Sequence, residues 1–289
     1  MQPGGTTTLA GHPVARVGFG AMQLAERFGR PDVDKDTAVG ILRAAVDGGV
    51  NHIDTAQFYG PGTANELIRA ALHPYPADLV LVSKVGAAYD GGLVLAQRPE
   101  QLRAGVEANL ATLGVERLAV VNLRRADAQP GVIASGDQVV DLDSQLAELV
   151  ALRDAGKIGG IGLSNVSVEQ LRRALPAGIV CVQNSHSLLD RVSEPVLDLC
   201  REHEIAWVPF FPLGSGFPGL PKVTDQARVI AVAERLGVTP AQVGLAWHLA
   251  HYSRTLLIPG TASPVHLVEN LAAGDVVLDA EAVAALESA

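Results

Sequence analysis

The sequence is poor in cysteine and short of basic residues, and each shortage excludes a class of function. The two cysteines, Cys181 and Cys200, are too few for a disulfide framework or a metal site, so we expect buried, unreactive thiols. There are 22 Lys and Arg residues against 31 Asp and Glu, which gives a formal charge of −9. Nucleic acids and acidic membrane surfaces attract basic patches, so neither is expected as a partner.

Long hydrophobic runs are also lacking. Apolar stretches such as LVLVSKVG are strand-sized and interrupted by charge, far below the roughly 20 residues that cross a bilayer. The opening residues, MQPGGTTTLAGHPVARVG, contain no basic region followed by an apolar one, as a secretion signal would. We therefore expect a soluble protein of the reduced cytoplasm.

What the sequence does contain is a regular alternation of two patterns. The 289 residues, 48% of them hydrophobic, are enough for one large α/β domain or two average ones. No linker or charge block marks a boundary, so we expect a single domain over residues 1–289. The patterns predict eight strands, at 14–22, 51–56, 79–86, 118–124, 158–165, 179–184, 205–213 and 255–260. They predict helices at 34–48, 64–73, 99–113, 144–155, 168–175, 194–203, 225–236, 240–250 and 264–273.

Strands separated by helices run parallel, and eight such units favour a closed (β/α)8 TIM barrel. An open doubly wound sheet is the alternative, but its G-x-G-x-x-G signature is incomplete in GFGAMQ. The stretch TTTLAGHPVARVG fits a β-hairpin that plugs the N-terminal end of the barrel. The final LDAEAVAALESA fits one amphipathic C-terminal helix.

The ends of the second and third predicted strands carry three groups that suit acid catalysis. Asp54 ends the first of these strands, Tyr59 follows in the loop, and Lys84 is an isolated charge near the end of the other. A buried ammonium needs a carboxylate partner, and a phenol beside that ammonium becomes more acidic than its ordinary pKa of about 10. Alone, each residue has an ordinary structural explanation. Together, at the mouth of a barrel, they predict a general acid for a carbonyl oxygen.

The remaining strand ends predict a site for a nicotinamide dinucleotide. Amides and a hydroxyl suited to a carboxamide follow strands five and six, and aromatic rings with a Pro/Gly turn follow strand seven. Strand eight leads into a helix whose N-terminus suits a phosphate. The residues are Ser164, Asn165, Gln183 and Asn184, then the stretch VPFFPLGSG, then the stretch IPGTASPVHLVEN.

The whole chain resembles the aldo-keto reductases, through NHIDTAQFYG, SKVG, GLSN, VQN, PFFPLG and IPG…EN. Within that family it is similar to the bacterial pyridoxal reductase branch, through GFGAMQLA, VVNLR, VCVQN and LLIPGTAS. The resemblance implies that Tyr59 is the acid, with a pKa lowered by Lys84, which Asp54 holds in place. RRAD stands where the family has HRPD, so Arg124 replaces a His. Arginine stays cationic and only donates, so Arg124 is expected to orient the carbonyl or attract an anionic substituent.

The resemblance also implies the cofactor and substrate contacts. The expected cofactor is NADPH, with NADH possible because the cation usually found near the 2′-phosphate is absent. The implied cofactor residues are Ser164, Asn165, Gln183, Phe210, Pro212, Leu213, Gly214, Ser215, Gly260, Thr261, Ser263, His266, Glu269 and Asn270. Residues that could face the substrate are Met22, Gln57, Val85 and Arg124.

Three functions fit these residues. The first is reduction of pyridoxal or a similar aldehyde by an NADPH-dependent enzyme. The second is reduction of a secondary-metabolite ketone or imine, which the same groups could serve. The third is a cofactor-bound regulatory subunit without catalysis, which the intact set of Asp54, Tyr59 and Lys84 disfavours. Only a small-molecule carbonyl partner is expected, and the family's usual monomer is the default.

Overall fold

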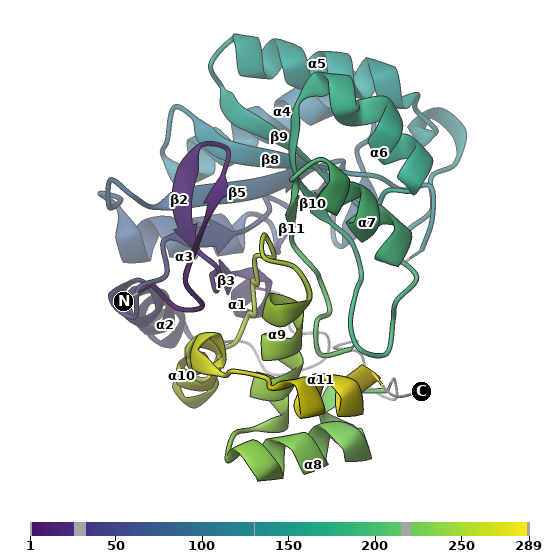
Figure 1. The fold of residues 1–289 in the computed structure, drawn as a ribbon. Helices are drawn as coiled ribbons and strands as arrows, with labels where there is room; N and C mark the ends of the chain where they lie inside the picture. Colours follow the sequence, from purple (N-terminus) through teal and green to yellow (C-terminus); the bar gives the residue numbers. More distant parts are fainter. Residues whose placement is uncertain (1, 26–32, 130, 215–220, 288–289) are drawn as a thin grey trace.

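The structure is a computed structural model that describes residues 2–25, 33–129, 131–214 and 221–287. Its main sheet has seven parallel strands in the order β11-β10-β9-β8-β5-β4-β3 (Figure 1). The eighth position is taken by a short stretch in which Thr255 bridges Trp207 and Leu257 bridges Val17, both in parallel. These bridges close the sheet into a ring and confirm the predicted (β/α)8 barrel. The strands are β3 (Phe19–Gly20), β4 (His52–Asp54), β5 (Val80–Val85), β8 (Leu118–Arg124), β9 (Ile158–Ser164), β10 (Ile179–Gln183) and β11 (Ala206–Trp207).

Helices follow the strands and cover the outside of the ring (Figure 1). Local signals fix their ends: Asp34 caps α2 by accepting from the Thr37 amide, and Gly114 ends α4 in the left-handed region at φ +70°. The α-helices are α1 (Met22–Ala25), α2 (Lys35–Asp47), α3 (Thr63–Leu72), α4 (Pro99–Leu113), α5 (Leu142–Asp154), α6 (Val168–Ala174), α7 (Glu194–Glu202), α8 (Ala227–Leu236), α9 (Pro240–His251), α10 (Pro264–Ala272) and α11 (Ala280–Glu287). Short 3₁₀ turns are η1 (Gly136–Gln138), η2 (Leu175–Ala177), η3 (Val223–Asp225) and η4 (Ala273–Asp275).

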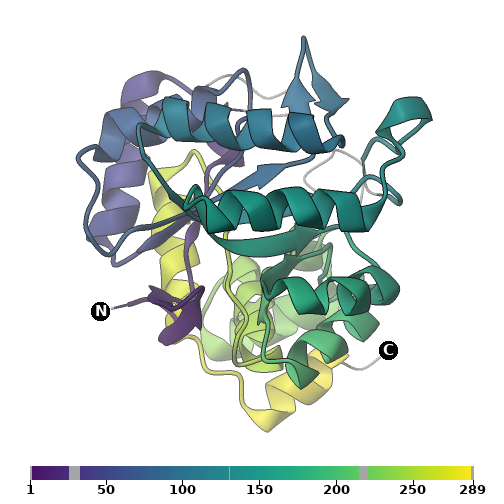
Figure 2. The same cartoon turned by 90° about the horizontal axis from the view of Figure 1, so that it is seen from above.

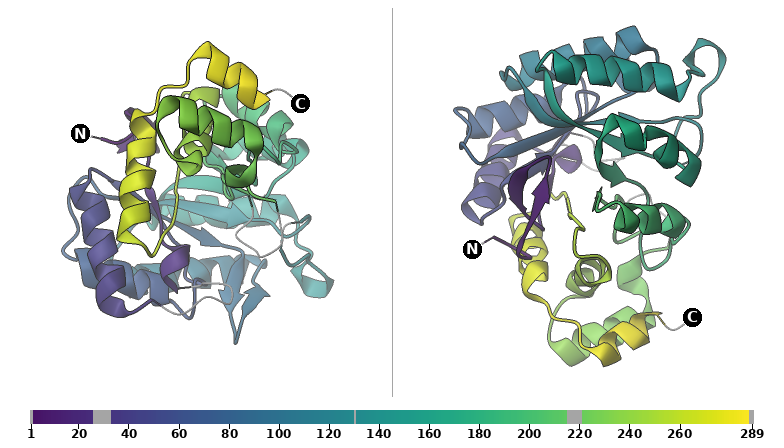
Figure 3. Two further views of the ribbon diagram at one scale, coloured as in Figure 1. Left: turned by 90° about the horizontal axis from the view of Figure 1, so that it is seen from below. Right: turned by 45° about the horizontal axis from the view of Figure 1, so that its top comes forward.

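The predicted N-terminal plug is present as the hairpin of β1 (Thr6–Leu9) and β2 (His12–Ala15). The hairpin lies across one end of the barrel (Figure 3). Its Leu9 and Val14 are buried among side chains that line the barrel, including Val80 at the start of β5 and Val120 in β8. Because β5 begins at Val80, the plugged end is the N-terminal end of the strands. The opposite end is left for a site.

Several predicted boundaries were wrong. The strand expected at 14–22 breaks into β2, β3 and the helix α1, so Met22 begins a helix. The strands expected at 205–213 and 255–260 are reduced to β11 and to isolated bridges. An unpredicted antiparallel hairpin, β6 (Ala87–Tyr89) with β7 (Leu93–Leu95), follows β5 and stands out from the body of the barrel (Figure 2).

The predicted C-terminal helix is α11. Its buried Ala282 and Leu286 pack in one cluster with Val229 and Val232 of α8. No helix within the described residues is both long enough and apolar enough to span a bilayer.

Candidate active site

Asp54 and Lys84 form a buried ion pair inside the barrel. Asp54 is the last residue of β4, Lys84 lies near the end of the adjacent strand β5, and their exposed fractions are 2% and 7%. The Lys84 ammonium contacts Oδ1 of Asp54 and donates to the Thr55 carbonyl at 3.1 Å. Burial opposes the charge on Lys84, but Asp54 and Tyr59 outweigh it and raise the pKa of Lys84. The ammonium is therefore kept charged.

Tyr59 lies next to this pair. Its loop folds back so that the Tyr59 amide donates to the Ala56 carbonyl at 3.1 Å, and its ring packs edge-on against Phe58. Lys84 Nζ is 4.9 Å from the centre of the Tyr59 ring. Unlike Asp54 and Lys84, Tyr59 is only partly buried. The structure thus brings the three predicted groups together at the open end of the barrel.

Arg124 reaches the same place from β8. Strand alternation puts it on the inner face with Asn122, and it is half-buried. Burial lowers the pKa of Arg124, and the electrostatic influence of Tyr59 acts in the opposite direction, so the guanidinium and the phenol are neighbours. Gly131, at φ +109°, leaves room for the guanidinium, since a side chain there would collide with Nη2 of Arg124. The next residue, Arg125, is buried and serves structure: it binds Asp127 and the Val140 carbonyl.

Gln97 was not predicted, yet it ties together the strand ends that carry Lys84 and Arg124. Its Nε2 donates to the carbonyl of Gly86 at 2.6 Å and to that of Arg124 at 2.9 Å. Gln145 of α5 in turn donates to the Gln97 carbonyl at 2.6 Å. The sequence offered no signal for this brace, because Gln97 stands in a loop just before a helix, where a polar residue is ordinary.

Ser164 and Gln183 are partners in the parallel register of β9 and β10, and both are buried. Gln183 donates through Nε2 to Oδ2 of Asp54 at 2.7 Å, while its Oε1 is buried and accepts no hydrogen bond within the described part of the chain. Asn165 takes a left-handed conformation at φ +60°, and its Nδ2 donates to the Ala128 carbonyl at 2.8 Å. A carboxamide-bearing ligand fits here, because a buried acceptor that lacks a donor suits the NH₂ of a nicotinamide.

The predicted stacking ring and pyrophosphate loop follow β11. Phe210 is half-buried, its ring is edge-on to Phe211, and its amide donates to the Asn184 carbonyl at 3.0 Å. Pro212 and Leu213 lead into Gly214, whose φ of +87° and close approach to the Pro221 carbonyl require glycine. Ser215 lies outside the described residues.

The last predicted cofactor segment joins the closing stretch of the barrel to α10. Gly260 approaches the Gly20 carbonyl so closely that a side chain at Gly260 would collide with it. The buried Thr261 hydroxyl accepts from the Ser263 amide at 3.0 Å, and Ser263 caps α10 by accepting from the amide of His266. His266 itself is exposed, Glu269 is half-buried and Asn270 is buried. The first turn of α10 is therefore preformed, with His266 as the one basic residue among those predicted in this segment.

The predicted substrate wall needs one correction. Val85 is 1% exposed and packs in the outer core, where a side chain at Gly105 of α4 would crowd it. Because Lys84 points inward, strand alternation turns Val85 outward, away from the mouth. Gln57 is half-buried and its Oε1 accepts from Asn65 of α3 at 2.8 Å, and Met22 is half-buried at the start of α1.

Behind Gln57 lies a buried polar network that sequence reasoning also missed. Asn65 of α3 accepts from the Thr55 hydroxyl at 2.8 Å and donates to Asn109 of α4 at 2.9 Å; Ser83 donates to the same Asn109 at 2.6 Å. Both asparagines are at most 1% exposed. The sequence does carry a signal for this network, because both asparagines lie among the apolar residues of α3 and α4 that become buried. Buried amides are expected to be paired by hydrogen bonds.

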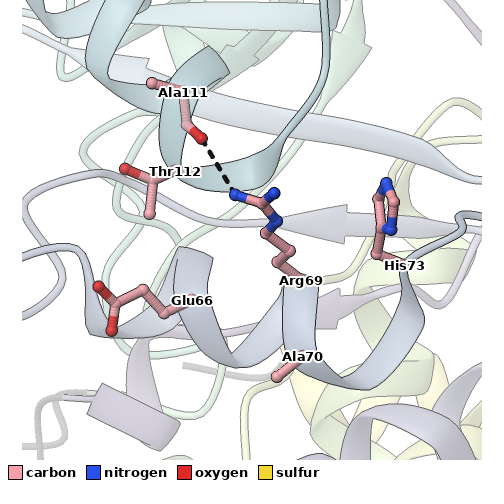
Figure 4. Close-up of a pocket in the computed structure, with 6 residues that line it drawn as sticks. All are labelled: Glu66, Arg69, Ala70, His73, Ala111 and Thr112. Atoms are coloured by element: carbon pink, nitrogen blue, oxygen red, sulfur yellow. Dashed lines mark hydrogen bonds between the residues drawn. The ribbon is translucent and has the colours of Figure 1, made fainter.

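Two other features lie apart from this site. A surface hollow between α3 and α4 is lined by Glu66, Arg69, Ala70, His73, Ala111 and Thr112, and Arg69 donates across it to the Ala111 carbonyl at 3.4 Å (Figure 4). It contains none of the predicted site residues.

The second feature is a cluster in which His186, Glu194 and His251 come close enough to hold a metal ion. Oε1 of Glu194 already accepts from Arg191 and approaches His251 Nε2 at 2.9 Å, so hydrogen bonds account for this arrangement.

Comparison with known proteins agrees with this geometry. The model of the aldo/keto reductase family matches residues 16–289. Pyridoxine 4-dehydrogenase of Escherichia coli (strain K12) is 42% identical over 287 residues, which cover 98% of this chain and 97% of that protein. Two crystal structures of aldo-keto reductases from Klebsiella pneumoniae are each 27% identical to this chain. The one in complex with NADPH has a TM-score of 0.81, and the match covers 99% of this chain and 95% of that one. The one in complex with NADP and acetate has a TM-score of 0.80, with 98% and 94% covered. The family predicted from the sequence is thereby confirmed: this chain belongs to the aldo/keto reductases.

Proposed function

We propose that this aldo/keto reductase is an NADPH-dependent carbonyl reductase that acts on pyridoxal or a similar planar aldehyde. The observation that carries the proposal is the contact of a buried, carboxylate-anchored ammonium with a partly exposed tyrosine. Lys84 is fixed by Asp54 and lies 4.9 Å from the centre of the Tyr59 ring. A tyrosine in that arrangement can act as a general acid toward a substrate oxygen that takes up a proton.

The proposed mechanism divides the work between the cofactor and the chain. When bound, reduced nicotinamide supplies the hydride that adds to the carbonyl carbon. Tyr59 donates its hydroxyl proton to the carbonyl oxygen, so that the product is an alcohol. Lys84 stabilises the tyrosinate left behind, and Asp54 keeps Lys84 charged and in position. Arg124 donates to the carbonyl oxygen or its neighbouring substituent and takes no part as a base, because a guanidinium stays protonated.

The substrate class is supported by Arg124 and by the relatives. A cation beside Tyr59 favours an aldehyde with an anionic group next to the carbonyl. Pyridoxal has such a group, its phenolate. The similar protein from E. coli is a pyridoxine 4-dehydrogenase. We further propose that the chain acts as a cytoplasmic monomer on small molecules, and its deficit of basic residues supports the exclusion of nucleic acids.

The cofactor proposal rests on the carboxamide site and on relatives that bind NADPH or NADP. Gln183 Oε1 and Ser164 would hold the nicotinamide carboxamide, Phe210 its ring, the turn at Gly214 the pyrophosphate, and the first turn of α10 the 2′-phosphate. NADH is the alternative, since His266 is exposed and stands without a second basic residue in that turn.

One experiment tests both parts. The full chain is mixed with NADPH and a panel of aldehydes and ketones that includes pyridoxal, and the loss of NADPH absorbance is followed; the panel is repeated with NADH at the same concentration. We expect turnover of pyridoxal or another planar aldehyde, and faster turnover with NADPH. Preference for a ketone over the aldehydes would contradict the proposed substrate class, and faster turnover with NADH would contradict the proposed cofactor. Tight NADPH binding without any turnover would favour a regulatory subunit instead.

A further inference from the structure

The two oxygens of Asp54 have different partners. Oδ1 contacts the Lys84 ammonium, and Oδ2 accepts from Gln183 Nε2 at 2.7 Å. Asp54 and Gln183 are both almost fully buried, with exposed fractions of 2% and 1%. A buried carboxylate oxygen that lost its donor would be left without water to replace it. Gln183 therefore completes the hydrogen bonding of the carboxylate that anchors Lys84.

This hydrogen bond crosses the interior of the barrel. Asp54 ends β4 and Gln183 ends β10, and the sheet places β5, β8 and β9 between these two strands. Only the amide NH₂ of Gln183 suits the side that faces Asp54, because the amide oxygen would be repelled by the carboxylate. The orientation of the amide is thus fixed by the charge of Asp54, and its oxygen must point elsewhere.

That oxygen, Oε1, is buried and accepts no hydrogen bond in the part of the chain that the structure describes. Its register partner on β9 is Ser164, another residue with a polar side chain at this end of the barrel. A buried amide oxygen without a donor beside a serine fits the NH₂ of a carboxamide ligand. One side chain consequently faces Asp54 with its nitrogen and the proposed nicotinamide position with its oxygen.

We propose that Gln183, beyond its place in the carboxamide site of the proposed function, is a positioning residue for the acid: its amide nitrogen holds Asp54, the carboxylate that anchors Lys84. The inference rests on the proposed function and adds to it a physical connection between cofactor binding and the acidity of Tyr59. The nitrogen of Gln183 places a partial positive charge against Asp54. Removing it leaves more negative charge facing Lys84 and Tyr59 and makes the phenol harder to ionise.

Other charged or titratable groups also face this connection. Lys84 of β5 and Arg124 of β8 act on Tyr59, and the Cys181 thiol of β10 is close enough to Asp54 to be influenced by its charge. Burial is the main cause that raises the pKa of the Cys181 thiol, and the negative charge of Asp54 is the second. The thiol therefore stays neutral at ordinary pH. A change in the ionisation of Tyr59 on altering Gln183 alone is therefore assigned to the contact with Asp54.

The test measures tyrosinate absorbance against pH in the enzyme without cofactor, and NADP⁺ binding separately. The Tyr59 contribution is isolated by subtracting the same titration of Tyr59→Phe. Gln183→Met keeps the side-chain length but cannot donate. We expect it to raise the pKa of Tyr59 by about 0.5 or more and to weaken NADP⁺ binding about tenfold, which is the effect of one lost hydrogen bond.

The matched control is Ser164→Ala, which should weaken NADP⁺ binding and leave the titration of the cofactor-free enzyme unchanged. Gln183→Leu is the second variant, in case Gln183→Met does not fold: it also removes both the donor and the acceptor, and the pKa of Tyr59 should rise by a similar amount. A wild-type titration in both Gln183 variants would overturn the link to Asp54, and wild-type NADP⁺ affinity would overturn the link to the cofactor. Aldehyde reduction by the unaltered enzyme is measured separately. Its outcome tests the proposed function and does not bear on the role of Gln183.

Discussion

At the scale of single residues, the proposed chemistry depends on the hydroxyl of Tyr59. Replacing Tyr59 with Phe keeps the ring that packs against Phe58 and removes the proton donor. We expect kcat for aldehyde reduction to fall at least about a hundredfold, the lower bound for loss of a general acid. The dissociation constant of NADP⁺, measured by fluorescence quenching, should change little. The control is Tyr89→Phe on the exposed hairpin, which should retain full activity. Retained turnover by Tyr59→Phe would remove this residue from the mechanism.

The sequence resemblance predicts that Arg124 takes the place of a histidine in the family pattern, and we expect its charge to act on substrate choice more than on proton transfer. Arg124→His should keep measurable turnover, because Tyr59, Lys84 and Asp54 remain. Its kcat/KM for pyridoxal relative to a neutral aromatic aldehyde should fall about tenfold, since a charge-assisted hydrogen bond is lost. The measurement is kcat/KM for both aldehydes. An unchanged ratio would show that Arg124 does not select the anionic group.

These residues differ in how far the sequence could predict their place. Asp54 and Lys84 end neighbouring strands, so their meeting follows from topology alone. The contact between Gln183 and Asp54 joins residues 129 apart across the barrel and depends on how the ring closes, which no local pattern encodes. The prediction that Val85 faces the substrate was wrong, although the sequence was enough to avoid it. Once Lys84 points inward, its neighbour in the strand must point outward.

At the scale of elements, the N-terminal hairpin stabilises the barrel by filling the N-terminal end of its interior. Leu9 is 2% exposed and packs in the cluster of barrel-lining side chains that includes Val120. Leu9→Ala should lower the free energy of unfolding by about 2–5 kcal/mol, the usual cost of such a cavity. Urea unfolding measures this loss. Thr8→Ala, at an exposed position of the same strand, is the control and should cost less than about 0.5 kcal/mol. Equal losses in both variants would contradict the role of the hairpin as a plug.

The elements that were predicted well are those with a strong local signal. The helices α2, α4 and α9 have caps or glycine stops that can be read directly, and the long buried strands β5, β8 and β9 stand out as apolar runs. The β6–β7 hairpin was missed although its turn, Asp90-Gly91-Gly92, is a hairpin signal. It sits in a strand-to-helix connection, where the alternating pattern leads one to expect only a loop. Near the point of closure the strands β3 and β11 have two residues each, and the rest of the pairing is through isolated bridges.

At the scale of the whole molecule, burial of uncharged histidines ties stability to pH. His52 of β4 and His248 of α9 are each 1% exposed. Burial lowers the pKa of His52 to about 4 and that of His248 to about 3, against 6.5 for an ordinary histidine. A histidine held neutral in the fold takes up its proton only on unfolding. The stabilisation is thus complete above about pH 6.5 and is lost as the pH falls towards these values.

Between pH 7 and pH 5 the unfolded chain therefore gains up to two protons that the folded chain does not. The free energy of unfolding should fall by about 3–4 kcal/mol over this range, at most about 1.4 kcal/mol per pH unit for each histidine. Urea unfolding at the two pH values measures this difference. His52→Leu should remove about half of it, while His12→Gln, at an exposed position, should leave it unchanged. Equal stability of the unaltered protein at pH 7 and pH 5 would mean that the two buried rings accept protons without unfolding, and the packing of His52 against Gly18 makes that outcome unfavourable.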